Sequence, residues 1–400
     1  MPVPERTSYI ITFKPKDKRA DKKSDKVDIL RSAIKSPVNV VDAASVLRLP
    51  RALPLENLAL DINEYAAPII AASLTAGDIA ALKADPNVQS VEPDGICYAL
   101  AAVEGLPSPL VETIPWGIDR IKAPQAWDIT KGKGIKVAVV DTGIDYTHPD
   151  LSPNYRGGIS FVPTETDPRD YNRHGTHVAG TIGAAINGTG VIGVAPSAYL
   201  YAVKILSSAG SGQWSWLIAG IQWCISNGMQ ALNMSLGGPS APTALQAICD
   251  LAWSRGLILV AAAGNSGGAV GFPAKYQSVI AVSAIDSANL IAGFSSRGPE
   301  VELCAPGVNV LSTLPGNTYG TLSGTSMASP HVAGVAALAL SSHRWSPPGL
   351  AHNVAVRRLL ALTADNLGIP GRDQLYGFGR VDAEEAAFSF LVPPAVPGIP

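Results

Sequence analysis

Three residues that can together perform nucleophilic catalysis occur in the order Asp141, His174 and Ser326. Asp141 ends the apolar run KVAVVD, His174 opens HGTHVAG, and Ser326 lies in GTSMASPHVAG. A serine hydroxyl attacks a carbonyl only when an imidazole accepts its proton, and a carboxylate must fix the tautomer of that imidazole. Alone, Asp141 would be interpreted as a turn residue and Ser326 as a helix cap. Together with His174 they predict acyl transfer by a serine nucleophile.

Attack on a carbonyl creates an oxyanion, which needs hydrogen-bond donors that are already in place. Ser326 precedes a long apolar run, so we expect it at a helix start, where its own backbone amide is available. Asn265 follows the apolar strand LILVAAA and carries a side-chain amide. We therefore expect these two groups to form the oxyanion site.

Two further motifs fail on their context. Gly188, Gly190 and Gly193 have the spacing of a dinucleotide-binding loop, but a helical pattern precedes them and a strand pattern follows, which is the reverse of that fingerprint. Ser266 is central in GNSGG, yet the following Gly271 and Pro273 prevent the helix that a nucleophile elbow requires. A cofactor-binding α/β enzyme is therefore a weak alternative, and Ser266 a weak nucleophile candidate.

The elements that must position these residues are short apolar strands alternating with amphipathic helices after about residue 115. This alternation predicts an α/β fold with a doubly wound, mostly parallel sheet flanked by helices, whose chemistry lies at the carboxyl ends of the strands. The first hundred residues read as a small α+β unit. We expect a unit at 1–100, a linker or processed segment at 101–113, the main domain at 114–386 and a tail at 387–400.

Composition limits the partners of the chain. The 30 basic and 32 acidic residues give a net charge of -2, so neither nucleic acid nor an anionic membrane is an expected partner. No apolar run reaches the 18 to 20 or so residues of a membrane span. The N-terminal residues MPVPERTSYIITF lack the features of a secretory signal. Either the chain acts in the cytoplasm or its signal is not included here.

The four cysteines have no CxxC spacing and lie far apart in the chain. Metal binding through thiolates is therefore not predicted. We expect buried free thiols, and the sequence leaves a disulfide between Cys224 and Cys249 open.

Five segments, VAVVDTGIDYTHPDL, HGTHVAGTIGA, LNMSLGG, AAAGN and GTSMASPHVAG, closely resemble the subtilisin family of serine endopeptidases. The resemblance runs from about Ile114 to Ala386 and implies the subtilisin-like fold. It also implies Asp141 as the orienting carboxylate, His174 as the general base, Ser326 as the nucleophile and Asn265 as the oxyanion donor.

The resemblance further implies how a peptide substrate binds. Gly271 would form the floor of the first specificity pocket, open to large apolar or aromatic side chains, and Ser266 replaces an acid at its rim. Trp214 would line the pocket three positions upstream. An extended substrate would pair with two backbone segments, formed by Gly210, Ser211 and Gly212 and by Ser235, Leu236 and Gly237.

A structural calcium ion is also implied by the resemblance. Oxygen-only ligands suit calcium, and the family commonly holds one in the glycine loop at 185–191. Glu300 and Glu302 match a second, weaker cation site. The positions that match the first site are Glu112, Asp150, Ala185, Asn187, Thr189 and Val191.

The first hundred residues resemble the inhibitory, folding-assisting propeptide of secreted subtilisins, chiefly through YIITFK and LTAGDIAALKADPNVQSVEPD. One alignment places cleavage after Leu100 and another after Leu110, and we favour Leu100. The resulting hypothesis is a monomeric endopeptidase precursor that cleaves its own propeptide and then acts broadly on proteins and peptides. We expect it outside the cell, with the cytoplasm as the alternative. A catalytically inactive, protease-like binding protein is the alternative function.

Overall fold

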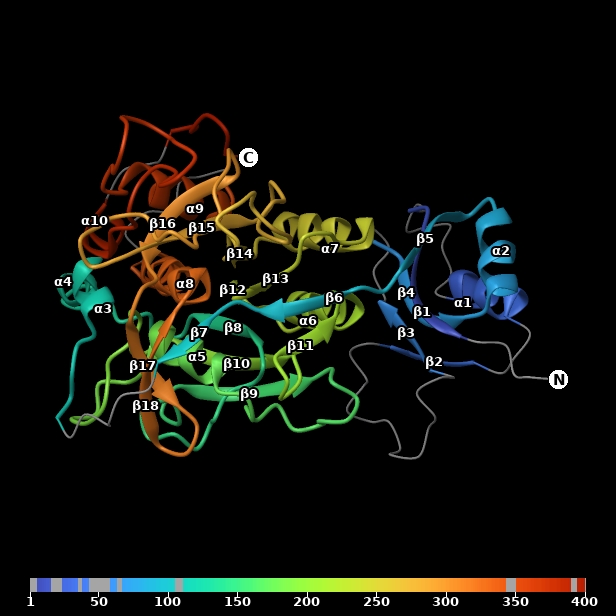
Figure 1. The fold of residues 1–400 in the computed structure, drawn as a ribbon, viewed down its shortest axis with the longest axis horizontal. Helices are drawn as coiled ribbons and strands as arrows, with labels where there is room; N and C mark the ends of the chain where they lie inside the picture. The colour runs from blue at the N-terminus through green and yellow to red at the C-terminus, as the bar shows by residue number, and fades with distance from the viewer. Residues whose placement is uncertain are drawn as a thin grey trace.

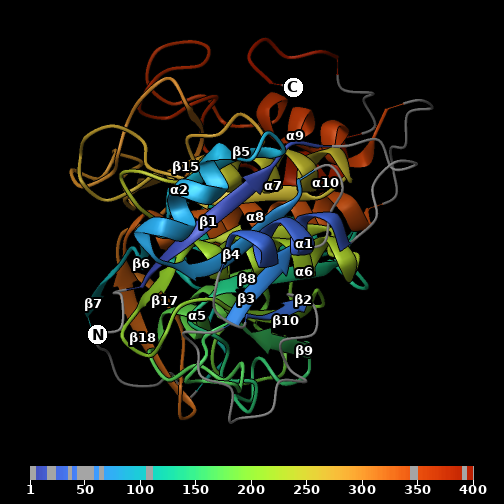
Figure 2. The ribbon, with the colours of Figure 1, turned by 90° about the vertical axis from the view of Figure 1, so that its right-hand side faces the viewer.

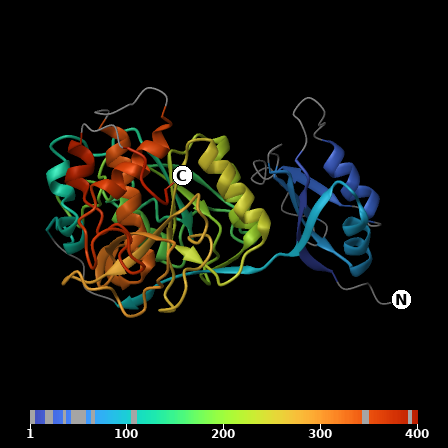
Figure 3. The same cartoon turned by 90° about the horizontal axis from the view of Figure 1, so that it is seen from above.

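The computed structural model describes residues 6–15, 24–34, 38–42, 58–62, 67–104, 111–342, 350–389 and 394–399. These residues form a small N-terminal unit and a large unit joined by one extended segment (Figure 1). Figure 3 shows the two units side by side, with that segment running between them.

The large unit is built on a seven-stranded sheet with the order β16-β15-β14-β12-β8-β10-β9. Every neighbouring pair in this sheet is parallel, as expected for a doubly wound arrangement. Its strands are β8 (Lys136–Asp141), β9 (Tyr155–Ser160), β10 (Tyr199–Lys204), β12 (Ala231–Met234), β14 (Ile258–Ala262), β15 (Ile280–Ile285) and β16 (Val301–Pro306).

Helices cover both faces of this sheet because alternate strand residues point to opposite sides. In β8, Val137 and Val139 join one buried cluster, while Ala138 and Val140 join the other. The first cluster holds α5 and α8, and the second holds α6 and α7. The helices are α3 (Trp116–Arg120), α4 (Ala123–Ala126), α5 (His174–Gly183), α6 (Trp214–Ser226), α7 (Thr243–Ser254), α8 (Thr325–Ser341), α9 (His352–Leu362) and α10 (Ala383–Phe388).

The small unit is a five-stranded sheet with the order β2-β3-β4-β1-β5 and two helices on one face. Ile11 and Ile70 pack with the helices, whereas Ile10 and Ile69 face the large unit. Figure 2 views the molecule from the small unit, with α1 and α2 in front of its sheet. The elements are β1 (Thr7–Phe13), α1 (Ser24–Ala33), β2 (Asn39–Asp42), β3 (Leu58–Ile62), β4 (Ile69–Leu74), α2 (Ala76–Ala84) and β5 (Val88–Pro93).

The segment that joins the units lies across the large unit as two short strands. The first, β6 (Ile96–Ala99), pairs with β11 (Ser211–Gln213) on one side and β13 (Leu236–Gly237) on the other. The second, β7 (Ala102–Glu104), pairs with β18 (Thr318–Ser323), which also pairs with β17 (Val310–Leu314). The alternative cleavage position Leu110 lies outside the described residues.

The fold also shows the state of the cysteines. All four are buried free thiols, which confirms the expectation of free thiols, and Cys224 and Cys249, whose pairing the sequence left open, are not bonded to each other. Burial raises the pKa of Cys97 to about 12, so this thiol stays protonated at neutral pH. Within the described part of the chain, no helix combines the length and the apolar character that crossing a membrane requires.

Candidate active site

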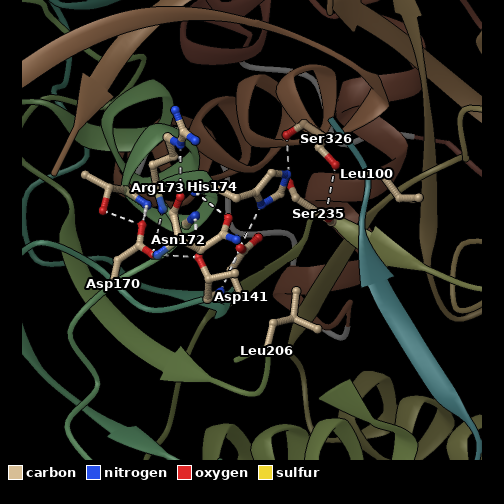
Figure 4. Close-up of polar contacts among 12 residues, drawn as sticks. Leu100, Asp141, Asp170, Asn172, Arg173, His174, Leu206, Ser235 and Ser326 are labelled. Carbon is tan, nitrogen blue, oxygen red and sulfur yellow. Dashed lines mark hydrogen bonds and ion pairs between the residues drawn. The ribbon is translucent and has the colours of Figure 1, made fainter. Parts of the chain in front are cut away.

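The fold brings Asp141, His174 and Ser326 together although they are far apart in the chain (Figure 4). Asp141 is the last residue of β8, His174 is the first residue of α5, and Ser326 is the second residue of α8. In Figure 4 the imidazole of His174 lies between the carboxylate of Asp141 and the side chain of Ser326. All three side chains are buried.

The contact between Asp141 and His174 orients the imidazole. The Nδ1 atom of His174 lies 2.7 Å from Oδ1 of Asp141, and the backbone N–H of Thr142 donates to the same oxygen at 2.7 Å. Burial lowers the pKa of His174, but the charges of Asp141 and Asp170 and the hydrogen bond to Asp141 outweigh it and raise the pKa. The Nε2 atom is buried and has no hydrogen-bond partner among the described residues. This nitrogen is therefore available to accept a proton.

Ser326 does not donate its hydroxyl to His174 in this structure. Its Oγ donates to the backbone carbonyl of Ser235 at 2.8 Å, and the Oγ of Ser235 donates to the carbonyl of Ser326 at 2.8 Å. The reciprocal pair anchors the start of α8 against the loop before β13. The hydroxyl must therefore turn from the Ser235 carbonyl to reach the imidazole.

Asn265 occupies the position expected of an oxyanion donor. Its Nδ2 donates to the carbonyl oxygen of Leu100 at 2.8 Å. Its Oδ1 accepts from the backbone N–H and the Oγ1 of Thr325, at 2.9 and 2.7 Å, which fixes the amide orientation. A Cβ on Gly324 would lie 2.4 Å from the oxygen of Leu100, so only glycine admits this carbonyl. The carbonyl of Leu100 is thus held between the Asn265 amide and the start of α8.

Strand β6 lies as an extended peptide between the two backbone segments expected to bind substrate. Ser211 and Gly212 are opposite Tyr98 and Cys97, and the N–H of Ala99 donates to the carbonyl of Gly210 at 2.9 Å. On the other side, Leu236 is opposite Ala99 and Gly237 is opposite Tyr98. Ser235 differs from its neighbours, because it contacts Ser326 and is not paired with β6.

A cavity of about 620 Å³ opens beside Leu100 and contains the expected Gly271 and Ser266. A Cβ on Gly271 would lie 3.1 Å from the carbonyl of Gly238, so a larger residue there would crowd the wall. Lys275 also lines this cavity, and no motif in the sequence indicates this position. The lining is mostly small and apolar.

Trp214 is buried beside the chain three to five residues upstream of Leu100. A Cβ on Gly95 would lie 3.1 Å from Cδ1 of its indole, and one on Gly238 would lie 2.9 Å from its Cζ2. Cys97 belongs to the same buried cluster and donates its Sγ to the carbonyl of Gly212 at 3.3 Å. The indole of Trp214 therefore lies against the chain at Gly95, five residues before Leu100, and Cys97, three residues before Leu100, shares its buried cluster.

Comparison with known proteins identifies both units. The sequence profile of the subtilase family, Peptidase S8, matches residues 132–379, and that of peptidase inhibitor I9 matches residues 8–99. The chain belongs to the subtilase family. It is 51% identical to subtilisin E of Bacillus subtilis (strain 168) over 325 residues, which cover 79% of this chain and 80% of that protein. Subtilisin of Bacillus pumilus is 54% identical over 284 residues (69% and 99%), and M-protease of Shouchella clausii (strain KSM-K16) is 48% identical over 322 residues (80% and 79%).

These findings confirm three of the predictions from sequence. The α/β fold with a small N-terminal α+β unit is that of a subtilase with its propeptide domain. The protein is a subtilisin-like serine endopeptidase, and it carries an I9 propeptide domain.

The propeptide of this subtilase contacts the peptidase unit at the N-termini of two helices. Glu92 accepts hydrogen bonds from the backbone N–H and Oγ1 of Thr243, the first residue of α7. Asp94 accepts from the N–H and Oγ of Ser215, in the first turn of α6. Neither helix has a side-chain cap of its own, so the propeptide carboxylates satisfy free amides and face the positive ends of two helix dipoles. Because Glu92 and Asp94 are two residues apart in SVEPD, the sequence indicates that their side chains lie on the same face of a strand. It does not indicate that they bind Thr243 and Ser215.

The glycine loop of the subtilase presents oxygen atoms that suit calcium. Asp150 accepts hydrogen bonds from Val191 N at 2.9 Å and Asn187 Nδ2 at 2.9 Å, and Glu112 accepts from Asn187 N at 2.7 Å. Among the described residues, no hydrogen bond reaches the backbone carbonyls of Ala185, Asn187, Thr189 or Val191. The loop therefore offers backbone carbonyl oxygens next to the carboxylates of Asp150 and Glu112. This set of oxygen atoms fits a calcium ion.

The prediction that Glu302 binds a second cation is wrong. Glu302 is buried and paired with Arg357, whose Nε and Nη2 lie 2.8 and 2.6 Å from the two carboxylate oxygens. Both oxygens are thus engaged by one guanidinium, the geometry in which this pair is strongest. Glu300, the other expected ligand, lies 3.9 Å from the Lys275 ammonium.

Proposed function

We propose that this subtilase is a precursor that cleaves its own chain after Leu100 and then hydrolyses proteins and peptides broadly through Asp141, His174 and Ser326. The observation that carries the proposal is the hydrogen bond from Asn265 Nδ2 to the carbonyl of Leu100 at 2.8 Å. That contact places the Leu100 carbonyl against a donor of the kind that stabilises an oxyanion.

The proposed reaction follows from the positions of these groups. His174 Nε2 takes the proton of Ser326 as Oγ attacks the carbonyl carbon of Leu100, while Asp141 stabilises the imidazolium through Nδ1. Asn265 donates to the developing oxyanion, and the backbone N–H of Ser326 is the expected second donor. The imidazolium then protonates the amine of Ala101 as the Leu100–Ala101 bond breaks. Water, deprotonated by His174, releases Leu100 from the acyl-enzyme.

After cleavage, other peptides take the place of β6. Main-chain pairing with β11 and β13 gives affinity with little sequence demand. The cavity of about 620 Å³ beside Leu100 favours a large apolar or aromatic side chain before the scissile bond. The site is complete within one chain, so we propose a monomer. We propose action outside the cell, where a propeptide that fills the cleft delays activity until cleavage.

N-terminal sequencing of the matured protein tests the proposal. We expect a new terminus at Ala101. A first cut at any other bond would contradict the cleavage step, and a stable full-length chain without peptidase activity would favour an inactive binding protein instead.

Removal of calcium should lower thermal stability. A ligand at a hundred times its Kd stabilises a protein by about 2.7 kcal/mol, which corresponds to a fall of about 5 to 10 °C in Tm for a domain of this size. Calorimetry of the full-length Ser326→Ala chain, with and without chelator, measures this without autolysis. In the Asp150→Ala variant we expect Tm to be lower and independent of chelator. Equal Tm values with and without chelator for the Ser326→Ala chain that keeps Asp150 would contradict the proposed calcium site.

Loss of the propeptide carboxylates should weaken the docking of the propeptide. Each capping interaction is worth about 0.5 to 2 kcal/mol, so the loss of its carboxylate should speed local opening at each helix start by about 2- to 30-fold. Hydrogen exchange of the Ser215 and Thr243 amides in a full-length Ser326→Ala chain that also carries Glu92→Ala and Asp94→Ala measures this. Lys83→Ala on α2 is the exposed control. Unchanged exchange at both amides would refute the capping role.

A further inference from the structure

A second buried carboxylate, Asp170, lies next to the catalytic pair and is not explained by the mechanism above (Figure 4). Asp170 precedes His174 by four residues, and its side chain is 2% exposed. Five hydrogen-bond donors converge on it. Its Oδ1 accepts from Thr142 Oγ1 at 2.9 Å, Asn172 N at 2.8 Å and Arg173 N at 3.0 Å, and its Oδ2 accepts from Thr176 N at 2.9 Å and Thr176 Oγ1 at 2.6 Å.

Asp170 determines where the helix that carries His174 begins. The residue before that helix, Arg173, has φ 103° and provides no side-chain cap. A helix start leaves backbone N–H groups without partners, and a nearby carboxylate can accept from them. Asp170 accepts from the N–H groups of Arg173 and Thr176, which bracket His174 in the chain. The position of the imidazole therefore depends on this carboxylate.

Thr142 connects Asp170 to the other member of the catalytic pair. Its hydroxyl donates to Asp170 and accepts the N–H of Gly175 at 2.9 Å. Its own N–H donates to Asp141 Oδ1 at 2.7 Å. The two segments are in close contact here, because a Cβ on Gly175 would lie 2.2 Å from the carbonyl oxygen of Gly143. One buried hydroxyl thus ties the loop after Asp141 to the start of the helix that bears His174.

We propose that Asp170, acting through Thr142, is a positioning residue that fixes Asp141 and His174 relative to each other. It also supplies a second negative charge near the imidazole. This inference rests on the hydrolysis mechanism proposed above. It assigns to Asp170 a role distinct from that of Asp141, because Asp170 does not touch the imidazole through any hydrogen bond of the structure.

The other charged and titratable groups around His174 allow the effect of the Asp170 charge on the pKa of His174 to be measured by itself. Asp141 faces Nδ1 from β8, and its charge and that of Asp170 both raise the pKa of His174 against the opposing effect of burial. His177, one turn along α5, is neutral at pH 7, because burial lowers its pKa to about 3. The buried Lys204 on β10 donates to the carbonyl of Thr142 and pairs with Glu165, and the side chain of Arg173 donates to the carbonyl of Asn172. Removing the charge of Asp170 alone should therefore lower the pKa of His174.

Two variants of Thr142 test the hydroxyl bridge in the matured enzyme. Thr142→Val keeps the shape and removes the hydroxyl, whereas Thr142→Ser keeps the hydroxyl. Because small misplacements of catalytic groups cost up to about 100-fold in rate, we expect Thr142→Val to lower kcat by about 10- to 100-fold with KM changed by less than about twofold. Thr142→Ser should stay within about twofold of the wild type. Equal kcat values for the two variants would overturn the bridge.

Asp170→Asn tests the charge. We expect a lower kcat, and the acid limb of the kcat/KM profile should move to lower pH because the imidazole loses a stabilising anion. In Thr142→Val the carboxylate is still present, so that limb should not move. A limb that stays in place in a folded Asp170→Asn enzyme would overturn the electrostatic part of the proposal.

Two controls keep the inference separate from the proposed function. If Asp170→Asn does not fold, as judged by its thermal transition, the Thr142 pair decides the positioning role. NMR titration of the ring of His174 in the full-length Ser326→Ala chain, with and without Asp170→Asn, measures the charge effect without any turnover. An inactive wild type would refute the proposed function, whereas an active wild type matched by Thr142→Val would refute only this inference.

Discussion

Replacement of Ser326 by alanine is expected to leave the chain at full length and to abolish peptide hydrolysis. In subtilisin, a relative of this chain, loss of the nucleophile costs about 10⁶-fold in kcat, and we expect the same order here. The physical reason is that His174 Nε2 then has no hydroxyl to deprotonate, so no acyl-enzyme forms at Leu100. Intact mass and N-terminal sequencing of the purified chain measure self-cleavage, and a chromogenic peptide measures turnover.

The control for this prediction is Ser254→Ala, an exposed serine at the end of α7. It should mature at Ala101 and match the wild type in kcat and KM. Ser326→Ala should retain its fold, because only the hydrogen bond to the carbonyl of Ser235 is lost. A Ser326→Ala chain that still cleaves itself at the wild-type rate would show that another residue is the nucleophile.

The fold and the reacting residues could be predicted because their signals are local. Alternating apolar strands and amphipathic helices determine the layers, and Asp141, His174 and Ser326 each stand at the end of a strand or the start of a helix. Local information also excludes cofactor binding by the glycines at 188, 190 and 193, because a helix precedes them and a strand follows them.

The remaining contacts depend on partners that are distant in the chain, and no spacing rule indicates them. Glu302 was expected at a weak cation site, but it is buried against Arg357, 55 residues away. Glu92 and Asp94 meet helices more than 100 residues downstream, at Thr243 and Ser215. The hydroxyl of Ser326 donates to the carbonyl of Ser235, 91 residues away, and the local sequence does not indicate this rotamer.

Replacement of Asn265 should slow both self-cleavage and peptide hydrolysis while substrate binding is nearly unchanged. The amide Nδ2 already contacts the Leu100 carbonyl, but a hydrogen bond to a charged acceptor is roughly twice as strong as one to a neutral carbonyl. Its contribution therefore grows as the oxyanion forms. We expect kcat to fall by about 10²- to 10³-fold, the range found for the corresponding kind of donor in subtilisin.

Asn265→Asp is the most informative variant, because it keeps the shape and the oxygen that accepts from Thr325 N and Oγ1. It replaces the Nδ2 donor by a negatively charged oxygen beside the site of the oxyanion. Because like charges repel, its kcat should fall below that of Asn265→Ala. Thr325→Val removes the Oγ1 contact while leaving the Nδ2 donor in place, and its loss in kcat should be smaller than that of either. If Asn265→Asp instead raised KM and left kcat unchanged, Asn265 would bind the ground-state peptide alone and the oxyanion site would have to be sought elsewhere.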